Sequence, residues 1–288
     1  MSLYPQFAKP NTTEQASQLL SGLSTGAVII AGGQEIMPSV NYGHLMPSVY
    51  VDINSLSDLE GISFDNNELS IGALTVHREI QNNALVNEHL PLLAYAARWV
   101  GGGWQVHNRG TIGGNIVSMH PLYDIIPSLI ILDADIEIIS SKGTNRVSIS
   151  NLLSDTSHGL GSKSILSKII IKPMTKNSGW SYEKLKMTSG GYGSANSAAI
   201  VETQSSKITK LRVSVGAVSP LPVDISDSLS SLIGNEWNDN LTDIITSKCS
   251  SLFEDALSDQ QGDDEWRRSM ASVMAIRSIK AAIKNINS

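Results

Sequence analysis

The sequence predicts an α+β protein of two domains, and three observations lead to this class. Its 288 residues are enough for one large or two medium domains, and 41% of them are hydrophobic, which is ordinary for a chain with a buried core. Helix-like and strand-like segments both occur, but they do not alternate strictly as in a doubly wound parallel sheet. A polar stretch with Pro and Gly over 172–179 separates two parts. We therefore expect one domain over 1–175 and a second over 176–288.

The first expected element is a helix near the N-terminus. Thr12 and Gln15 have the spacing of a capping box, and the apolar residues that follow share one helical face. These apolar residues are Ala16, Leu19, Leu20 and Leu23. After Gly26, an apolar run over 27–30 is expected to form a strand.

Short apolar runs bounded by turn residues indicate the other elements of the first part. Asn66-Asn67 and Lys142-Gly143 mark turns between strands. Pro91 suits the first turn of a helix, and Gly101-Gly102-Gly103 is expected to end that helix. The expected strands cover 49–53, 69–72, 136–140, 147–149 and 165–172. One helix is expected to begin near residue 75, and two others are expected over 90–100 and 124–132.

In the second part, strands are expected over 180–186 and 211–218. The second of these alternates between apolar and polar residues, which is typical of a strand with one face in a core. Its apolar face holds Leu211, Val213 and Val215, and its polar face holds Arg212 and Ser214. The chain is expected to end in helices, the last over about 264–286.

Two glycine-rich segments are the strongest functional signal. Residues 31–35 read Ala-Gly-Gly-Gln-Glu after the expected 27–30 strand, and residues 111–115 read Thr-Ile-Gly-Gly-Asn. Paired glycines let the backbone turn tightly and approach a ligand closely, with N–H groups directed at an anion. Two such turns suit a ligand with two adjoining phosphates. Neither matches the G-x-G-x-x-G or G-x-x-x-x-G-K-[ST] nucleotide patterns.

The composition argues against several classes of function. The net charge of −6 and the lack of a basic run disfavour a nucleic-acid surface. No apolar stretch approaches the ~20 residues of a membrane helix, and Met1 to Pro5 lack the features of a signal peptide, so a cytoplasmic location is expected.

The chain offers little residue chemistry of its own. Cys249 is its single cysteine, so an iron–sulfur cluster would have to lie on another chain. No close histidine pair has metal-ligand spacing, and no G-x-S-x-G nucleophile motif occurs. The six histidines are His44, His77, His89, His107, His120 and His158.

The glycine segments stand at the head of a longer series of motifs. Pro38 follows the first, and the second lies within N-R-G-T-I-G-G-N over 108–115. Later come D-x-x-P over 124–127, Y-x-K over 182–184 and W-R-x-x-M-A over 266–271. In order and spacing over nearly the whole chain, this series resembles the FAD-binding medium subunit of molybdenum hydroxylases, a family that includes the carbon monoxide dehydrogenase flavoprotein and the flavin parts of xanthine dehydrogenase-type enzymes.

The resemblance implies a fold and a cofactor site. The fold would be a two-lobed FAD-binding domain of the vanillyl-alcohol-oxidase type over 1–175, followed by a smaller domain of sheet and helices over 176–288. Both glycine segments would hold the FAD pyrophosphate through backbone N–H groups, and the Thr111 hydroxyl and Asn115 amide would bind phosphate or ribitol. The residues so implied are Ala31, Gly32, Gly33, Gln34 and Glu35, and Thr111, Ile112, Gly113, Gly114 and Asn115.

Four further residues are implied at the cofactor. Asp124 would accept a hydrogen bond from the flavin, or would simply cap the helix that it precedes. Lys184 would place a positive charge near the flavin, or would be an ordinary exposed lysine on a strand. Tyr192, flanked by glycines, would lie against the isoalloxazine as a gate, or would belong to a surface turn. Leu166 completes the set.

The chain departs from the family pattern at three places. His120 stands where an acidic residue is common, Met187 and Thr188 stand where basic residues are usual, and Gly191 replaces an Asp before the loop aromatic. These departures concern the flavin contacts and leave the pyrophosphate segments intact.

The resemblance implies an electron-transfer function without a catalytic side chain on this chain. FAD would take electrons from [2Fe-2S] clusters on a small partner subunit and pass them to an external acceptor, while a large partner subunit with the molybdenum cofactor oxidises the substrate. The assembly would be a dimer of heterotrimers. The candidates for the interface are Trp104, Met119 and Leu122, each of which would be exposed near the flavin or would pack in the core instead.

Two other functions remain open. One is a self-contained FAD reductase on the same fold, similar to the enolpyruvyl-sugar reductase, which would need a proton donor and substrate-binding charges in its second domain. The other is an assembly module that has lost FAD.

Overall fold

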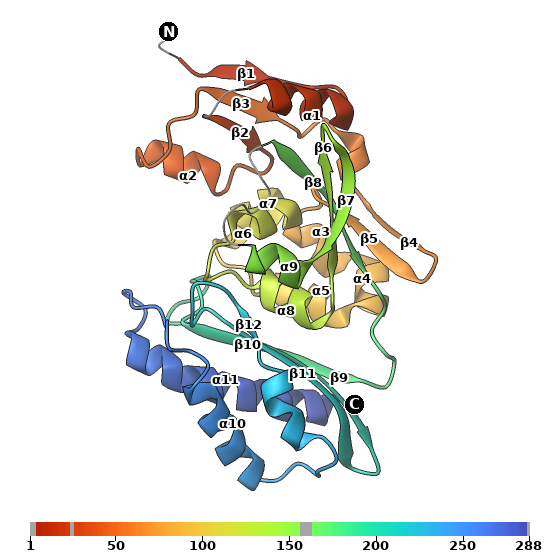
Figure 1. Ribbon diagram of the computed structural model, residues 1–288, viewed down its shortest axis with the longest axis vertical. Coiled ribbons are helices and arrows are strands. Elements are labelled where there is room, and N and C mark those ends of the chain that lie inside the picture. The colour runs from red at the N-terminus through yellow and green to blue at the C-terminus, as the bar shows by residue number, and fades with distance from the viewer. Residues whose placement is uncertain (1–3, 24–25, 156–162, 287–288) are drawn as a thin grey trace. The chain divides into compact units, whose positions relative to one another are not determined.

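The computed structural model describes residues 4–23, 26–155 and 163–286, which fold into two compact units. Unit 1 consists of Met1–Leu85, Trp104–Ser118 and Asp133–Lys172, and unit 2 of Val86–Gly103, Met119–Leu132 and Pro173–Ser288. Two segments from the first half of the chain therefore belong to the same unit as the C-terminal part (Figure 1). The mixture of helices with largely antiparallel sheets confirms the α+β class.

Unit 1 begins with a small parallel sheet in the order β1-β3-β2. The Thr12 hydroxyl caps helix α1 by accepting the Gln15 N–H at 3.1 Å, as the sequence predicts. Ala16 and Leu20 of α1 pack on Val51 of the sheet. The elements are β1 (Gln6–Ala8), α1 (Thr13–Gly22), β2 (Ala27–Ile30), α2 (Ile36–Asn41) and β3 (Val49–Asp52).

A second sheet of unit 1 is antiparallel, in the order β4-β5-β8-β6-β7. Asn66 and Asn67 both have positive φ angles and form the predicted turn between β4 and β5. The strand predicted over 147–149 is confirmed with different bounds: it belongs to β7, which begins at Gly143 and ends at Ser148, and the Ser148 hydroxyl caps the following helix by accepting the Asn151 N–H. The strands are β4 (Ile62–Asp65), β5 (Glu68–Gly72), β6 (Asp135–Ser140), β7 (Gly143–Ser148) and β8 (Ser164–Ile171).

Short helices complete unit 1, and several of them were not predicted. The helix predicted over 90–100 ends before the three glycines, at Arg98, but Gly103 then begins a helix that was not predicted, and the second glycine segment lies in another. The helical elements are η1 (Ser57–Leu59), α3 (His77–Asn82), α4 (Ala84–His89, shared between the units), α6 (Gly103–Arg109), α7 (Ile112–Ser118) and α9 (Ile149–Ser154).

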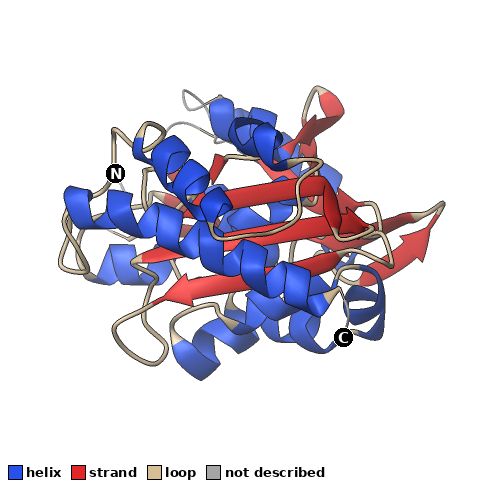
Figure 2. Ribbon diagram, turned by 90° about the horizontal axis from the view of Figure 1, so that it is seen from below, coloured by secondary structure: helices blue, strands red, loops and turns tan. Residues whose placement is uncertain are grey.

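Unit 2 is built on one antiparallel sheet in the order β12-β11-β10-β9, with helices on both faces. The long helix α11 lies along one face, as Figure 2 shows, and buries Met274, Ala275 and Ile279 in a core shared with α10. Leu211, Val213 and Val215 face this core as predicted. The elements are α5 (Pro91–Arg98), α8 (Ile125–Ile131), β9 (Gly179–Leu185), β10 (Ala195–Gln204), β11 (Lys207–Gly216), β12 (Val223–Asp224), η2 (Asp227–Leu232), α10 (Asn240–Ser250) and α11 (Asp264–Asn285).

The central strand β10 was not predicted, because its first residues are small and show no alternation. Ala195, Asn196, Ser197, Ala198 and Ala199 are all fully buried. Since helices cover both faces of the strand, neither face needs to be polar. The alternation used to recognise half-buried strands is therefore missing.

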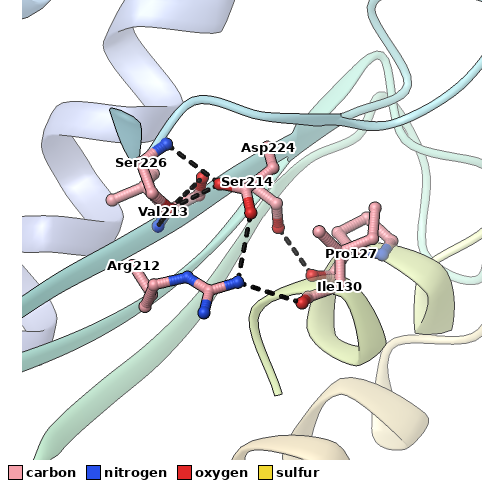
Figure 3. Close-up of polar contacts among 7 residues, drawn as sticks. All are labelled: Pro127, Ile130, Arg212, Val213, Ser214, Asp224 and Ser226. Carbon is pink, nitrogen blue, oxygen red and sulfur yellow. Dashed lines mark hydrogen bonds and ion pairs between the residues drawn. The ribbon is translucent and has the colours of Figure 1, made fainter. Parts of the chain in front are cut away.

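The opposite face of the sheet binds α8 through polar side chains of β11 (Figure 3). The Ser214 hydroxyl donates to the Pro127 carbonyl at 2.6 Å, and the Arg212 guanidinium donates to the Ile130 carbonyl at 3.3 Å while pairing with Asp224 at 3.1 Å. A cation at the C-terminal end of a helix is favourable for the helix dipole. The polar face predicted for this strand thus fixes α8 in place.

The start of α11 explains the W-R-x-x-M-A motif. Asp263 caps the helix by accepting the Trp266 N–H at 2.8 Å. The Arg267 side chain is fully buried and donates to the carbonyls of Ser194 (2.7 Å) and Ala217, and it also pairs with Asp259. It therefore joins the beginning of β10, the end of β11 and the helix. Among the described residues, no helix combines the length and apolarity that crossing a membrane requires.

Candidate functional site

The first glycine segment lies between β2 and α2 in unit 1. Gly33 has φ +70°, a conformation that favours glycine, and its carbonyl accepts the Met37 N–H at 3.0 Å, which begins α2. The Ala31 carbonyl accepts a hydrogen bond from the Asn54 amide at 3.0 Å. The five residues are half-buried. The backbone N–H groups of Gly32, Gly33 and Gln34 donate to no acceptor within the described chain, so they are available to a bound anion.

The two glycine segments are neighbours in space, although about eighty positions separate them in the sequence. A Cβ added at Gly32 would lie 1.9 Å from the Arg109 carbonyl oxygen and 3.2 Å from the Gly110 Cα. Only glycine permits this close approach of two backbones. The sequence predicted one shared site from the two motifs, and within unit 1 the structure brings them together.

The second segment is a correction. Residues 112–115 do not form a loop turn but begin helix α7. Gly113 is buried there, and a Cβ added to it would lie 2.7 Å from the Cβ of Ala73. Paired glycines disfavour a helix in general, but here close packing against the strand end requires Gly113. The Thr111 hydroxyl accepts the Gly114 N–H at 3.1 Å and so caps α7.

This helix changes the expected contacts with an anion. The N–H groups of Ile112 and Gly113 donate to the carbonyls of Thr75 (3.0 Å) and Ala73 (2.9 Å), so the protein itself already uses them. Gly114 is exposed and its missing side chain leaves open space, except for Thr111 Oγ1 at 3.1 Å. The second segment therefore contributes to ligand binding mainly by letting the ligand come close to the backbone at Gly114, and less by donating hydrogen bonds from backbone N–H groups.

Asn115 has the strongest sign of a missing partner in this region. It is 6% exposed, and its Oδ1 has no hydrogen-bond partner among the residues that the structure describes. A buried acceptor without a donor is unfavourable by roughly 1–3 kcal/mol. A hydroxyl group of a bound sugar or ribitol chain would supply the missing donor.

Next to this segment, His77 is a buried neutral histidine that sequence reasoning did not assign to the site. The backbone N–H of His77 donates to the Gly110 carbonyl at 3.1 Å. The His77 ring would lie 3.2–3.3 Å from a Cβ added at Gly110. Burial, assisted by repulsion from His107, lowers the pKa of His77 to about 3. The ring therefore supports the second glycine segment without adding charge.

In unit 2, Asp124 and Lys184 form a buried ion pair. Lys184 Nζ donates to Asp124 Oδ2 at 2.9 Å and to the Trp99 carbonyl at 2.9 Å, and its side chain has 0% exposure. The Tyr182 hydroxyl donates to the other carboxylate oxygen at 2.7 Å, and the Gly101 N–H adds a further bond. Asp124 thus joins the end of α5, the start of α8 and strand β9.

The pair excludes one of the two alternatives that the sequence left open for each residue. Asp124 precedes α8 but makes no capping bond to it, and Lys184 is not an exposed lysine. Burial raises the pKa of Asp124 and lowers the pKa of Lys184, and the attraction between the two groups opposes both shifts. Burial and the Asp124 charge raise the pKa of Tyr182 well above its usual range.

The role of Tyr182 was missed, although a signal for it exists. Residues two apart in a strand point to the same face, so the Y-x-K spacing places Tyr182 beside Lys184. No local pattern connects either residue with Asp124, which lies about sixty positions earlier.

The loop after β9 carries Tyr192, which is 40% exposed and stacks on His120. The ring centroids are 5.2 Å apart with 23° between the planes. His120, one of the departures from the family pattern, therefore contacts the expected loop aromatic directly. Met187 in the same loop is 77% exposed, and Gly191 lies close to Thr188.

The other expected positions divide between surface and core. Trp104 is 70% exposed, with the Arg78 guanidinium 4.1 Å from its ring, and Met119 is half-buried. Leu122 is only 7% exposed, so of its two alternatives the buried one holds. Leu166 on β8 is also buried.

Neither a metal centre nor a reactive thiol stands out in the part of the chain that the structure describes. Within it, no group of three metal-ligating side chains comes together, and His158 lies outside the described residues. Cys249 is buried, and burial raises its pKa to about 12, so its thiol stays protonated.

Comparison with known proteins matches both parts of the chain. Residues 4–174 match the family described as FAD binding domain in molybdopterin dehydrogenase, and residues 180–282 match the CO dehydrogenase flavoprotein C-terminal domain. Together the two matches cover nearly the whole sequence.

Full-length relatives agree with these matches. The carbon monoxide dehydrogenase medium chain of Hydrogenophaga pseudoflava is 28% identical over 278 residues, 96% of each chain, and the glyceraldehyde dehydrogenase medium chain of Sulfolobus acidocaldarius is 29% identical over 96% of this chain and 99% of that one. A solved structure of carbon monoxide dehydrogenase from Hydrogenophaga pseudoflava aligns with a TM-score of 0.93 at 26% identity, covering 99% of both chains. With these matches, the glycine segments and the Y-x-K and W-R motifs fall into one pattern: the chain belongs to the family of FAD-binding medium subunits of molybdenum hydroxylases.

Proposed function

We propose that this chain carries FAD as the electron-transfer subunit of a molybdenum hydroxylase and passes electrons from iron–sulfur clusters on a partner chain to an external acceptor. One observation carries the proposal. The two glycine segments meet at Gly32 and Arg109, next to N–H groups without acceptors and the unpartnered Asn115 oxygen. Two neighbouring phosphates joined to a hydroxyl-bearing chain fit this set of groups.

Within unit 1, the two glycine segments make different contacts with the cofactor. The N–H groups of Gly32, Gly33 and Gln34 donate to phosphate oxygens, which adds no charge that would need desolvation. Gly114 allows the ligand to approach the backbone of α7, and Asn115 accepts from a ligand hydroxyl. Ala31, Glu35, Thr111, Ile112 and Gly113 shape the two segments around these contacts, and Leu166 adds an apolar contact.

Within unit 2, Asp124 and Lys184 supply a fixed electrostatic environment for the flavin. FAD supplies a ring system that takes up and releases electrons singly or in pairs. The Lys184 ammonium, held by Asp124 and Trp99, keeps one position, so it contributes a constant positive potential. Tyr192 controls access to the ring from its loop.

The proposal places the remaining redox chemistry on partner chains. The single cysteine is buried and protonated, so it does not ligate a cluster, and the described residues contain no metal-binding group. The names of relatives support this division, since several are medium chains or FAD-subunits of dehydrogenases. We infer a small subunit with [2Fe-2S] clusters, a large subunit with the molybdenum cofactor and a dimer of such heterotrimers.

The proposal is tested by co-purification of the native complex. The chain is tagged in its native host, and the complex is analysed for subunits, molybdenum, iron and released flavin. We expect two partner chains and one FAD per copy of this chain, identified as FAD and not FMN by chromatography. A lone chain with bound FAD would favour the self-contained reductase, and a complex without flavin would favour the assembly module.

The substrate is sought with a panel based on the names of the relatives. Carbon monoxide, glyceraldehyde, caffeine and nicotine are each mixed with the complex under anaerobic conditions. Loss of the flavin absorption identifies an electron donor.

A further inference from the structure

The loop that carries Tyr192 has a base firmly fixed in unit 2. It leaves β9 after Leu185 and returns at Ser194, whose N–H donates to the Leu185 carbonyl at 2.8 Å. The Gly102 N–H donates to the Gly190 carbonyl at 2.9 Å. A Cβ at Gly101 would lie 3.0 Å from that same oxygen, so glycine permits this contact. Backbone hydrogen bonds thus hold the loop both at its base, between Leu185 and Ser194, and near its middle, at Gly190.

The Tyr192 side chain, two residues before Ser194, is held differently, by a stack of three rings. His120 lies 5.2 Å from Tyr192 and 4.7 Å from Tyr123, in both cases with 23° between the ring planes. Tyr192 and Tyr123 are themselves 6.1 Å apart. Ring contacts of this kind are weak compared with a buried ion pair.

Two hydrogen bonds within its own segment hold His120 in place. Its Nδ1 accepts the Leu122 N–H at 3.2 Å, and its carbonyl accepts the Tyr123 N–H at 3.1 Å. The preceding Met119 has φ +46°, an unfavourable conformation for a residue with a side chain. Backbone strain that persists beside an ordered side chain often accompanies a functional role for that side chain.

The segment of His120 and the loop of Tyr192 are joined at two levels. Asp124 and Lys184 connect them in the interior at 2.9 Å, and His120 and Tyr192 connect them at the surface. The interior pair is 0% and 2% exposed, whereas Tyr192 is 40% exposed. The inner connection is therefore shielded from solvent, and the outer connection is not.

We propose that His120 is a positioning residue that latches Tyr192 in a closed position through ring stacking, and so sets the access of the external electron acceptor. This inference rests on the proposed function, because it places the flavin behind the loop. The observation that carries the proposal is the stack itself, in which His120 lies between Tyr123 and Tyr192.

The expected size of the effect follows from the strength of ring stacking. A stacked aromatic pair shifts a two-state equilibrium by roughly two- to tenfold. The variant His120→Ala should open the latch by this factor, and His120→Phe should keep it closed because a ring remains. His120→Phe also removes Nδ1, so it separates the stack from the hydrogen bond to Leu122.

The first test needs no flavin and measures amide hydrogen exchange of residues 186–194 in the full chain. We expect exchange about two- to tenfold faster in His120→Ala and in Tyr192→Ala, no further increase in the double variant, and near-native exchange in His120→Phe. The matched control is His44→Ala, which removes a histidine 6.1 Å from Tyr42 in unit 1 and should leave this loop unchanged. Native exchange in His120→Ala, or equally fast exchange in His120→Phe, overturns the latch.

The second test measures reoxidation of the photoreduced complex by dichlorophenolindophenol. Faster reoxidation in His120→Ala, by the same two- to tenfold, with native rates in His120→Phe supports access control. Unchanged or slower reoxidation in His120→Ala contradicts it. If the complex contains no flavin, the proposed function fails, while the exchange experiment still decides whether the latch exists.

Discussion

Lys184 Nζ lies 2.9 Å from Asp124 Oδ2, and the two side chains are hidden from solvent at 0% and 2% exposure. The pair joins strand β9 to the start of α8, and through the Trp99 carbonyl and the Gly101 N–H it also holds the end of α5. A buried pair of this kind is costly to desolvate, so it is weak evidence for stability alone. Its value to the protein is a charge in a fixed position.

Removal of one partner should be much more harmful than removal of an exposed pair. Lys184→Met leaves the Asp124 carboxylate buried without its cation, and we expect a loss of about 3–5 kcal/mol in the free energy of unfolding. The double variant Lys184→Met with Asp124→Leu should lose less than Lys184→Met alone. Urea unfolding of the purified chain measures both.

The matched control is the half-exposed pair of Lys168 and Glu137, 3.3 Å apart. Lys168→Met should cost less than about 1 kcal/mol, because solvent screens this pair. Equal losses of unfolding free energy in Lys184→Met and Lys168→Met would show that breaking the buried pair is no more destabilising than breaking an exposed pair.

Gly114→Ala should separate ligand binding from folding. Gly114 lies in α7 and is exposed, so the change to alanine should alter stability by less than about 1 kcal/mol, because its higher helix propensity offsets the close contact of the added Cβ with Thr111 Oγ1 at 3.1 Å. Its methyl group would occupy the approach space of the ligand, and FAD content should fall. The control is Gly22→Ala at the end of α1, where an added Cβ meets nothing within 4 Å. Full FAD content in Gly114→Ala would remove this glycine from the binding site.

Acid should destabilise the folded chain through His77. Its pKa is about 3 when folded and 6.5 when unfolded, so between these values the unfolded chain binds a proton that the folded chain does not. Stability is therefore complete above pH 6.5 and falls as the pH decreases toward 3. From pH 7 to pH 5.5 we expect a loss of about 1 kcal/mol from this residue. His77→Gln should remove this part of the pH dependence and His44→Gln should keep it; an unchanged slope in His77→Gln contradicts the assignment.

Arg267 should be essential for the second unit, whereas its neighbour should not be. Arg267→Met leaves the Ser194 and Ala217 carbonyls and Asp259 without their donor, and we expect a loss of about 3–5 kcal/mol. Arg268→Met removes a half-exposed partner of Asp264 and should cost about 1 kcal/mol. Thermal unfolding of the two variants gives the comparison, and similar midpoints would refute the role of Arg267.

Local signals in the sequence were sufficient for many elements. The Thr12 cap, the Asn66-Asn67 turn and the alternation of β11 each depend on residues close together in the chain, and each is found as predicted. Strand β10 and helix α7 depend on packing against distant elements. Small residues are required there by close neighbours on both sides, and such neighbours are not visible in a local pattern.

The same distinction holds for the candidate site. The motifs indicate which residues to examine, and the Gly32 contact with Arg109 agrees with the expectation of a shared site. The pairing of Asp124 with Lys184 and the stacking of His120 on Tyr192 connect residues about sixty to seventy positions apart, and no spacing rule predicts them. Contacts that join distant segments are the part of the site that needed the structure.

The central claim is that this chain relays electrons and does not oxidise a substrate itself. The most direct measurement is the flavin absorption of the purified FAD-loaded chain under anaerobic conditions, first with the substrate panel given above and then with a chemical reductant. The same substrates are then added in the presence of the co-purified partner subunits. We expect no bleaching by any substrate with the chain alone, full bleaching by dithionite, and bleaching by one substrate once the partner subunits are present. Bleaching of the isolated chain by a substrate would contradict the account and identify a self-contained flavoenzyme.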